Sequence, residues 1–344
     1  METTQGVAID NNTHIINEKD ILFHPEEIGS GTFGKVYKGV LVPLSQTVAV
    51  KKVFQDKRFK NRELEIMLQL SHPNIIRLYG YYHTPAPSPS QDGSFLNCVM
   101  EYVPLTLSTA ISSYRRSNAA FPPFVAKLLS FQMLKAIGYL QSIGICHRDV
   151  KPQNIMFDTS TFTLKLCDFG CAKRLVKDES NINYICSRYY RPPELCLGCT
   201  KYSAQVDVWS MGCVIAEMAL MKPLFKGKTR AEQLKEIIKV LGTPSAQEIN
   251  EMNPDNKKVY KITKVAHKKW EDVFKGKTED CQFMDLVDKL LVYVPSKRMN
   301  PYQAMGHEYF KEIKEKRKEL PKHLFEFLDC EKEMFGKEIE RLMC

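Results

Sequence analysis

The hydrophobic pattern of the chain changes once, near Pro104, and this change limits the folds that the chain can adopt. Before it, residues 21–100 contain short β-rich runs, such as 47–53, around one charged helical stretch at 57–70. Beyond Pro104, apolar residues recur at helical spacing. We therefore predict an α+β protein with a small β-rich unit that contains one main helix, followed by a larger, mainly helical unit.

The helical spacing and the turn residues predict where elements begin and end. One apolar series stops at Gly144, which can adopt a left-handed C-cap conformation. Prolines and serines at 84–94 predict a surface loop, and a strand-like run at 95–103 resumes the sheet. The series before Gly144 consists of Val125, Leu129, Met133, Ile137 and Leu140. Further helices are predicted at 207–221, 230–241, 283–292 and 301–318.

These patterns divide the chain into four segments. Residues 1–19 are polar without a regular apolar period, and we expect a loosely held, flexible arm. Residues 20–103 and 104–310 form the two units, and 311–344 a C-terminal helical extension. Lysines and glutamates are mixed over 311–322, which favours a solvated helix face over a nucleic-acid surface.

Composition excludes several classes of protein. With 44% hydrophobic residues, the chain can bury a sizeable core, and its longest nearly apolar stretch, 211–221, is interrupted by Glu217 and too short to span a membrane. Eleven scattered cysteines without a signal peptide predict reduced thiols and a cytoplasmic protein, with a nuclear location also allowed. A net charge of +9 attracts anions, but the sign alone does not distinguish nucleic acid, acidic membranes and phosphorylated substrates.

A glycine-rich run at 29–36 matches G-x-G-x-x-G-x-V, in which backbone N–H groups approach phosphates without a Cβ clash. Because the glycines lead into a strand, we expect a hairpin over the phosphates rather than the helix of a dinucleotide-binding fold. Lys51 ends the next apolar strand and can reach phosphate oxygens. Glu63, twelve positions later, can pair with Lys51 and hold its ammonium group in place.

The most specific motifs are Cys-His-Arg-Asp-Val-Lys-Pro-Gln-Asn at 146–154 and Asp-Phe-Gly at 168–170, after an apolar strand at 164–166. Transfer of a γ-phosphoryl group requires Mg²⁺ held by hard oxygen ligands, which Asn154 and Asp168 offer. Asp149 would orient the acceptor hydroxyl and take its proton, and Lys151 would neutralise the transferring phosphate. Taken in order along the chain, these motifs resemble the protein-kinase set.

Several runs resemble the glycogen synthase kinase 3 family more closely, over roughly residues 20–310: 56–64, 144–154, 164–170, 184–191 and 236–244. The resemblance implies a bilobal protein kinase fold, ATP and Mg²⁺ as cofactors, and Ser/Thr substrates already phosphorylated four residues C-terminal to the acceptor. It places adenine at a hinge of Glu101, Tyr102 and Val103, with Met100 controlling the pocket behind it. The other ATP-binding residues that it implies are Ile28, Gly29, Ser30, Gly31, Gly34, Val36, Ala49, Lys51, Gln153, Asn154, Cys167 and Asp168.

The resemblance also implies sites outside the ATP pocket. Arg62, Arg148 and Lys173 match a pocket for the phosphate already on the substrate, and no threonine between Asp168 and Glu194 would compete for it. Tyr184 matches an activation-segment phosphosite, which could pair with Arg188 or Arg191. Pro192 replaces the usual alanine before Pro-Glu, and an extended segment should tolerate it. Glu194 is expected to pair with Arg298.

Two departures from the family concern regulation. Residues 1–20 contain neither the arginine nor the serine of a regulatory segment, and Lys257, Lys258 and Lys261 alter the segment at 255–265 that would dock a scaffold. Binding of an axin-like scaffold is therefore left open. We expect phosphorylated protein substrates as partners, and neither nucleic acid nor a membrane.

The sequence also bears on three alternative interpretations. A catalytically inactive kinase-like scaffold usually lacks the equivalents of Lys51, Asp149 or Asp168, and all three are present. A cyclin-dependent or mitogen-activated kinase is the next alternative, but no Thr-x-Tyr lies between Asp168 and Glu194. The spacing of Cys167, Cys171, Cys196 and Cys199 allows a zinc site, although free thiols are favoured. His147 is expected to pack and to bond backbone rather than to shuttle protons.

Overall fold

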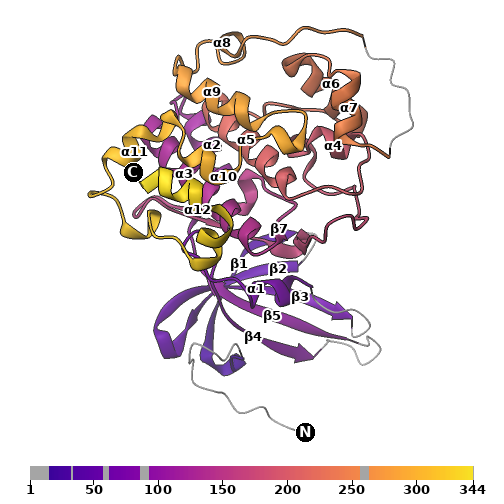
Figure 1. Ribbon diagram of the computed structural model, residues 1–344. Coiled ribbons are helices and arrows are strands. Elements are labelled where there is room, and N and C mark those ends of the chain that lie inside the picture. Colours follow the sequence, from indigo (N-terminus) through magenta and orange to yellow (C-terminus); the bar gives the residue numbers. More distant parts are fainter. Residues whose placement is uncertain (1–14, 32–33, 57–61, 86–92, 256–262, 344) are drawn as a thin grey trace. The chain divides into compact units, whose positions relative to one another are not determined.

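The chain forms two compact units, residues 1–104 and 105–344. The computed structural model describes residues 15–31, 34–56, 62–85, 93–255 and 263–343. In the described residues, strands are the main regular structure of the first unit and helices the main regular structure of the second (Figure 1). This confirms the predicted α+β class, with a small β-rich unit and a larger helical one.

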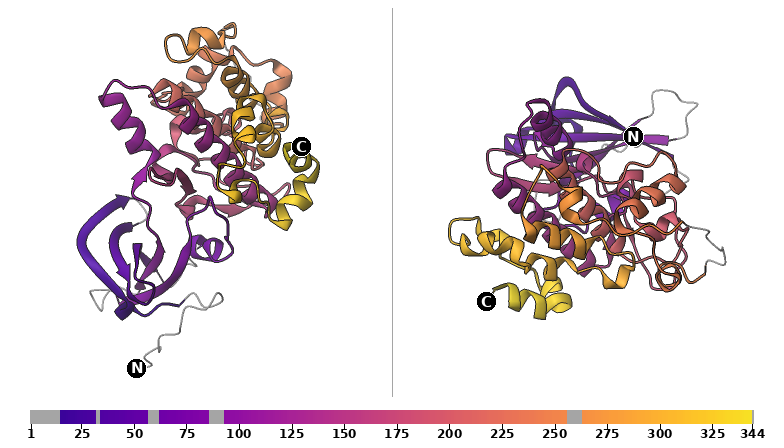
Figure 2. Two further views of the ribbon diagram at one scale, coloured as in Figure 1. Left: turned by 90° about the vertical axis from the view of Figure 1, so that its left-hand side faces the viewer. Right: turned by 90° about the horizontal axis from the view of Figure 1, so that it is seen from above.

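The first unit is a curled antiparallel sheet in the order β1-β2-β3-β5-β4 (Figure 2). Alternating residues of its strands, among them Leu41, Val48, Val50 and Val99, are buried together, as period-two patterning requires. Its strands are β1 (Ile21–Gly31), β2 (Gly34–Leu41), β3 (Gln46–Asp56), β4 (Leu78–Pro85) and β5 (Gly93–Glu101). Its helices are α1 (Arg62–Met67) and two short 3₁₀ helices, Glu18–Asp20 and Val42–Leu44.

The boundaries in this unit differ from the sequence predictions in three places. The helix predicted at 57–70 ends at Met67, and 57–61 lie outside the described residues. The predicted loop at 84–94 is shorter on both sides, because β4 runs to Pro85 and β5 begins at Gly93. Of the predicted arm, residues 1–14 lie outside the described part. Ile16, however, is buried and donates its N–H to Tyr81 at 3.0 Å, so the end of the arm is held against β4.

The second unit surrounds two helices that are apolar on nearly all sides, α3 (Pro123–Ser142) and α5 (Gln205–Leu220). As predicted, α3 stops before Gly144, which has φ 71°. The other helices are α2 (Leu107–Arg116), α4 (Pro193–Cys196), α6 (Arg230–Leu241), α7 (Ala246–Met252), α8 (Trp270–Val273), α9 (Cys281–Leu290), α10 (Pro301–Met305), α11 (Lys311–Glu315) and α12 (Asp329–Met343). The short strands are β6 (Leu105–Thr106), β7 (Ile145–Cys146), β8 (Ile155–Asp158), β9 (Thr163–Leu166) and β10 (Lys173–Arg174). Single 3₁₀ turns span Pro152–Asn154, Phe169–Cys171, Arg188–Tyr190, Pro295–Lys297, Glu308–Phe310 and Lys322–Leu324.

The single helix predicted at 301–318 is wrong. Helix α10 ends at Met305, a 3₁₀ turn follows at Glu308–Phe310, and α11 covers only Lys311–Glu315. The helix is interrupted at Gly306. His307 then caps the next turn, because its ring accepts the Tyr309 N–H at 3.2 Å. The break allows Phe310 to pack edge-on against Phe131 of α3, a contact that a continuous helical period does not reveal.

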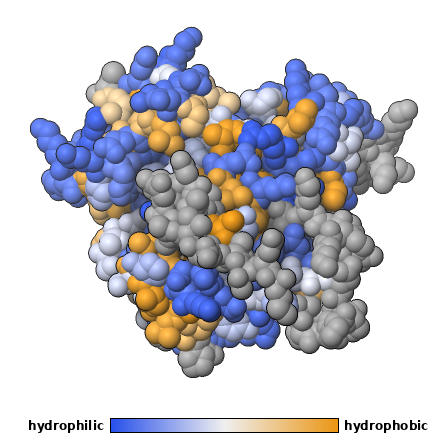
Figure 3. All heavy atoms as spheres, turned by 90° about the horizontal axis from the view of Figure 1, so that it is seen from below, coloured by the Kyte–Doolittle hydropathy of each residue, from blue (hydrophilic) through white to orange (hydrophobic). Residues whose placement is uncertain are grey.

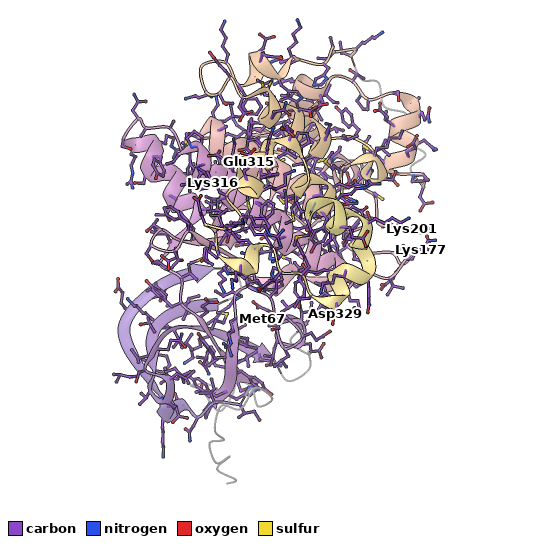
Figure 4. The ribbon with its side chains drawn as sticks, turned by 60° about the vertical axis from the view of Figure 1, so that its left-hand side comes forward. Met67, Lys177, Lys201, Glu315, Lys316 and Asp329 are labelled. Atoms are coloured by element: carbon purple, nitrogen blue, oxygen red, sulfur yellow. The ribbon has the colours of Figure 1, made fainter. Side chains whose placement is uncertain are left out.

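The C-terminal extension packs on α3 through a buried lysine. Lys135 of α3 donates to the carbonyl oxygens of His323 and, at 2.6 Å, Glu326, and its Nζ lies 5.0 Å from the centre of the Phe327 ring. Burial lowers the pKa of Lys135 to about 8. Nearby, Tyr302 donates to the buried carboxylate of Glu331, so the extension is part of the helical unit's core. Figure 4 marks Lys316, which follows directly after α11, and Asp329 at the start of α12.

On the face drawn in Figure 3, apolar side chains form separate patches among hydrophilic ones. Among the described helices, none combines the length and the apolar character needed to cross a lipid bilayer.

Candidate active site

In the sheet unit, Lys51 lies in β3 between neighbouring strands β2 and β5. Its Nζ is 2.6 Å from Glu63 Oε1 on α1, and both side chains are almost fully buried. A buried ammonium group requires a counter-charge, so this contact fixes where the Lys51 amine points. The predicted pair is present.

The glycine-rich run forms the predicted hairpin: β1 ends at Gly31 and β2 begins at Gly34, with Gly29 opposite Val36. Thr32 and Phe33 lie outside the described residues. Gly34 has φ +134°, and a Cβ there would lie 2.3 Å from the carbonyl oxygen of Lys52, so only glycine fits. The strand that follows excludes the helix of a dinucleotide-binding fold. Ile28 is exposed beside the hairpin.

The residues expected to hold adenine lie together at the end of β5. Ala49 of β3 is the strand partner of Met100. The Glu101 N–H donates to the Arg77 carbonyl at 2.9 Å, and the Arg77 N–H donates to the Glu101 carboxylate at 3.3 Å. Lys38 lies 4.8 Å from the centre of the Tyr102 ring, and Val103 is buried.

In the helical unit, the carboxylate of Asp149 collects four hydrogen bonds. Oδ1 accepts the N–H and the hydroxyl of Ser187 at 2.9 and 2.8 Å. Oδ2 accepts Lys151 Nζ at 2.6 Å and Asn154 Nδ2 at 3.1 Å. Lys151 also reaches the Ser187 hydroxyl at 3.2 Å. These donors stabilise the ionised carboxylate and aim it in one direction.

Sequence reasoning missed Ser187. The residue lies 38 positions after Asp149, in the run at 184–191, whose only sequence signal is its resemblance to the kinase family. No local pattern indicates that its hydroxyl reaches the catalytic loop, the loop at 146–154 that carries Asp149. Only the fold of the segment after Asp168 brings the two together.

Asn154 and Asp168 stand at the same end of a hairpin. Ile155 of β8 pairs with Leu166 of β9, and the N–H of Cys167 donates to the Asn154 carbonyl at 2.9 Å. Asp168 has a left-handed backbone, φ 64° and ψ 79°, which turns the chain sharply after β9. The backbone therefore holds Asn154 and Asp168, two residues with oxygen-bearing side chains, at the same end of this hairpin. Gln153 is exposed, and Cys167 is half-buried.

This donor set fits Mg²⁺ bound together with phosphates. The Asn154 amide nitrogen donates to Asp149, at 2.9 Å to its carbonyl and 3.1 Å to its carboxylate, so the amide oxygen is the atom left for a cation. Mg²⁺ takes few protein ligands and completes its shell with phosphate oxygens and water. The described residues contain no cluster of three or more His, Cys, Asp or Glu side chains that could hold a metal. Cys167, Cys171, Cys196 and Cys199 are free thiols.

The catalytic loop is anchored by Asp207, in the first turn of α5. Its buried carboxylate accepts the N–H groups of His147 at 2.7 Å and Arg148 at 2.8 Å, and the Cys146 thiol at 3.2 Å. Burial raises the pKa of Asp207, while these donors favour its ionised form. Sequence reasoning missed Asp207 as well, because an acid in the first turn of a helix is usually a surface residue.

His147 has the structural role that the sequence predicts. Its Nε2 lies 3.0 Å from the Cys167 carbonyl oxygen, its Nδ1 accepts the Asp149 N–H at 3.3 Å, and its ring packs edge-on against Phe169. The ring joins the catalytic loop to the segment that carries Asp168.

Two of the three basic residues expected to read a substrate phosphate lie in this unit. Lys173 is the strand partner of Cys146, and its amine contacts Asn181 at 2.6 Å and Glu179 at 2.9 Å. Arg148 donates to the Cys171 carbonyl at 2.6 Å and to the Tyr202 hydroxyl at 3.1 Å. Arg62 is exposed at the start of α1, in the sheet unit.

Tyr184 is 64% exposed, so it is not a packed aromatic. A hydrogen bond from Arg188 and the charge of Arg191 lower the pKa of its hydroxyl. The Arg191 guanidinium lies 4.5 Å from the centre of the ring. Two cations therefore already face the hydroxyl that would carry a phosphate.

The predicted pair of Glu194 and Arg298 is fully buried. Both carboxylate oxygens accept guanidinium nitrogens at 2.7 Å, and Arg298 also donates to the carbonyls of Val292, Gln205 and Tyr293. Pro192 is extended, with φ −71° and ψ 159°, as its position required. This pair ties α4 to the segment before α10.

We predict that Glu194→Gln lowers the free energy of unfolding by about 3–5 kcal/mol, because it leaves the buried Arg298 charge without a counter-ion. Urea denaturation of the full chain measures the loss. The matched control is Glu308→Gln, which removes an exposed ion pair with Lys311 at 3.3 Å. This substitution should cost less than about 1 kcal/mol of unfolding free energy. Equal effects of the two substitutions would contradict a special role for the buried pair.

The chain matches a known protein family. A family model described as protein kinase domain matches residues 24–310, which is most of the chain and includes every site residue described above.

Proposed function

Since the chain belongs to the protein kinase family and so transfers phosphoryl groups from ATP to proteins, we propose that its acceptors are serine and threonine hydroxyls of substrates that already carry a phosphate. The proposal combines the geometry around Asp149 with the resemblance to the glycogen synthase kinase 3 family.

The residues of the helical unit have separable roles in this reaction. Asn154 and Asp168 would hold Mg²⁺, which when bound neutralises charge on the β and γ phosphates. Asp149 orients the acceptor hydroxyl and takes its proton. Lys151 places a positive charge beside that carboxylate, where the transferring phosphoryl group becomes more negative. In the sheet unit, Glu63 directs the Lys51 amine, which the family uses on the nucleotide phosphates.

The observation that carries the Ser/Thr assignment is the contact among Asp149, Lys151 and Ser187. The Lys151 amine lies 3.2 Å from the Ser187 hydroxyl, and both donate hydrogen bonds to the Asp149 carboxylate. A lysine two positions after the catalytic aspartate is typical of the Ser/Thr kinases that the chain resembles, and it favours a serine or threonine hydroxyl as the acceptor.

The preference for primed substrates is supported by basic residues that surround the catalytic loop. Lys173 and Arg148 come from paired segments of the same unit, and the Lys173 amine now bonds Glu179 and Asn181. A substrate phosphate would replace these weaker acceptors with a stronger one. Arg62 is proposed as the third member. The segment proposed to dock a scaffold includes 256–262, which lie outside the described residues.

The function is tested with purified protein, Mg²⁺, labelled ATP and peptide pairs that differ only in a phosphate four residues after the acceptor. We expect transfer to serine and threonine but not tyrosine, and faster transfer to the primed member. Asp168→Asn should reduce turnover by about 10³-fold or more, because it removes a charged metal ligand. ATP binding without transfer to any peptide would favour the inactive scaffold.

For the primed-substrate pocket, we predict that Arg62→Ala lowers kcat/KM on the primed peptide by about 10- to 150-fold, the equivalent of one charge-assisted hydrogen bond. The unprimed peptide should be nearly unaffected. Lys318→Ala, at an exposed site on the C-terminal extension, is the control. Equal losses on both peptides would show that Arg62 supports the active site in general.

For Tyr184, we predict phosphorylation by the kinase itself. A phosphate adds about −1.5 to −2 charges beside Arg188 and Arg191, which already contact the hydroxyl. When both proteins are made in bacteria, the intact mass of the Tyr184→Phe variant should show one phosphate fewer than that of the wild type. Asp168→Asn protein should lack the same phosphate, and its presence there would show that another enzyme adds it.

A further inference from the structure

A cavity of about 420 Å³ opens between the end of α5, α6 and α8, outside the active site. Its floor is apolar and its rim carries two lysines. The lining residues are Leu220, Lys222, Pro223, Leu224, Val240, Lys268, Asp272 and Val273. The volume is in the range of small ligand sites and holds one or two large apolar side chains.

The wall of the cavity is held in place by backbone contacts. Helix α6 stops at Gly242, with φ +78°, where a Cβ would lie 2.8 Å from the His267 nitrogen. This close approach lets the segment before α8 cross the end of α6. The Lys268 N–H then donates to the Val240 carbonyl at 2.9 Å, and the Thr243 N–H to Val265 at 2.9 Å. The cavity is therefore formed without a ligand.

The surface around the cavity is strongly basic. Residues 222–228 and 263–277, which supply six of the eight lining residues and include α8, contain eight lysines and two carboxylates. These two segments account for most of the chain's net charge of +9. Lys222 and Lys268 are exposed at the rim, and Lys226, Lys264 and Lys269 are exposed beside them.

We propose that this cavity, with its rim of Lys222 and Lys268, is a docking site for an acidic peptide segment of a partner protein that inserts a large apolar side chain. An apolar pocket gives such a peptide its anchor, and the lysines attract the flanking carboxylates. Asp272 can accept a peptide N–H. A nucleic acid would use the lysines but has no side chain for the apolar floor, so the combination favours a peptide.

The docking site is separate from the residues of the helical unit that carry the reaction. None of its lining residues belongs to the catalytic loop or to the segment from Asp168 to Glu194. Within the helical unit, α8 and β7, which leads into the catalytic loop, lie at opposite ends (Figure 1). A bound segment would tether its protein to the kinase and raise its local concentration, without entering the active site.

The test measures binding of a fluorescent eight-residue peptide, a central Phe-Leu pair among six acidic residues, to the full chain without ATP. Lys222→Glu with Lys268→Glu should weaken binding about tenfold or more, and so should raising NaCl from about 50 to about 500 mM. Replacing Phe-Leu with Ser-Ser should weaken binding to wild type. Val273→Arg, which fills the cavity but keeps the positive charge, should remove the difference between the two peptides.

The control variant, Lys318→Glu with Lys337→Glu, makes the same charge change at exposed sites on the C-terminal extension and should bind as wild type does. Thermal melting checks that each variant is folded. If Val273→Arg does not fold, the comparison of peptide binding between the Lys222/Lys268 variant and the Lys318/Lys337 control still tests the proposal. Equal binding of both peptides to wild type overturns the proposal. The proposal is also overturned if the peptide does not bind while oligouridylate or phosphatidylserine vesicles do, and if that binding depends on Lys222 and Lys268. Because no phosphoryl transfer is measured, failure here leaves the proposed function standing.

Discussion

The carboxylate of Asp207 is the contact on which the helical unit's active-site geometry depends. It lies inside the protein at the start of α5 and accepts two backbone N–H groups and a thiol from residues 146–148. A buried carboxylate is stable only where such donors compensate for lost water. The loop must therefore adopt the one path that supplies them, and that path sets the position of Asp149.

Other buried charges connect segments that are distant in sequence by the same physics. Arg298 and Glu194 are 104 positions apart, and Lys135 contacts carbonyls 188 and 191 positions away. Each charge excludes alternative packings, because any arrangement that leaves it unpaired in the interior is costly. The C-terminal extension is held in this way, so the folded unit continues past the end of the matched kinase region at residue 310.

The sequence predicted the residues that carry the reaction better than it predicted the contacts between residues that are distant in the chain. Lys51, Glu63, Asp149, Asn154 and Asp168 stand in motifs whose spacing follows from phosphoryl transfer, and α6 was predicted with both of its ends. The helix predicted at 301–318 was wrong, because periodicity does not report that Gly306 and the His307 cap interrupt it. Ser187 and Lys135 were missed because their partners are far along the chain.

By itself, then, the sequence determined the class of fold, the change from a strand-rich unit to a helical one near Pro104, and the residues able to carry the reaction. These depend on local periods, on turn residues and on short motifs. Only the tertiary structure decided that Ser187 bonds the catalytic carboxylate, that Asp207 anchors the loop, and that two basic segments enclose an apolar cavity. The physical reason is that a hydrogen bond or a buried charge acts over a few ångströms in space, and a single sequence does not specify which distant residues come that close.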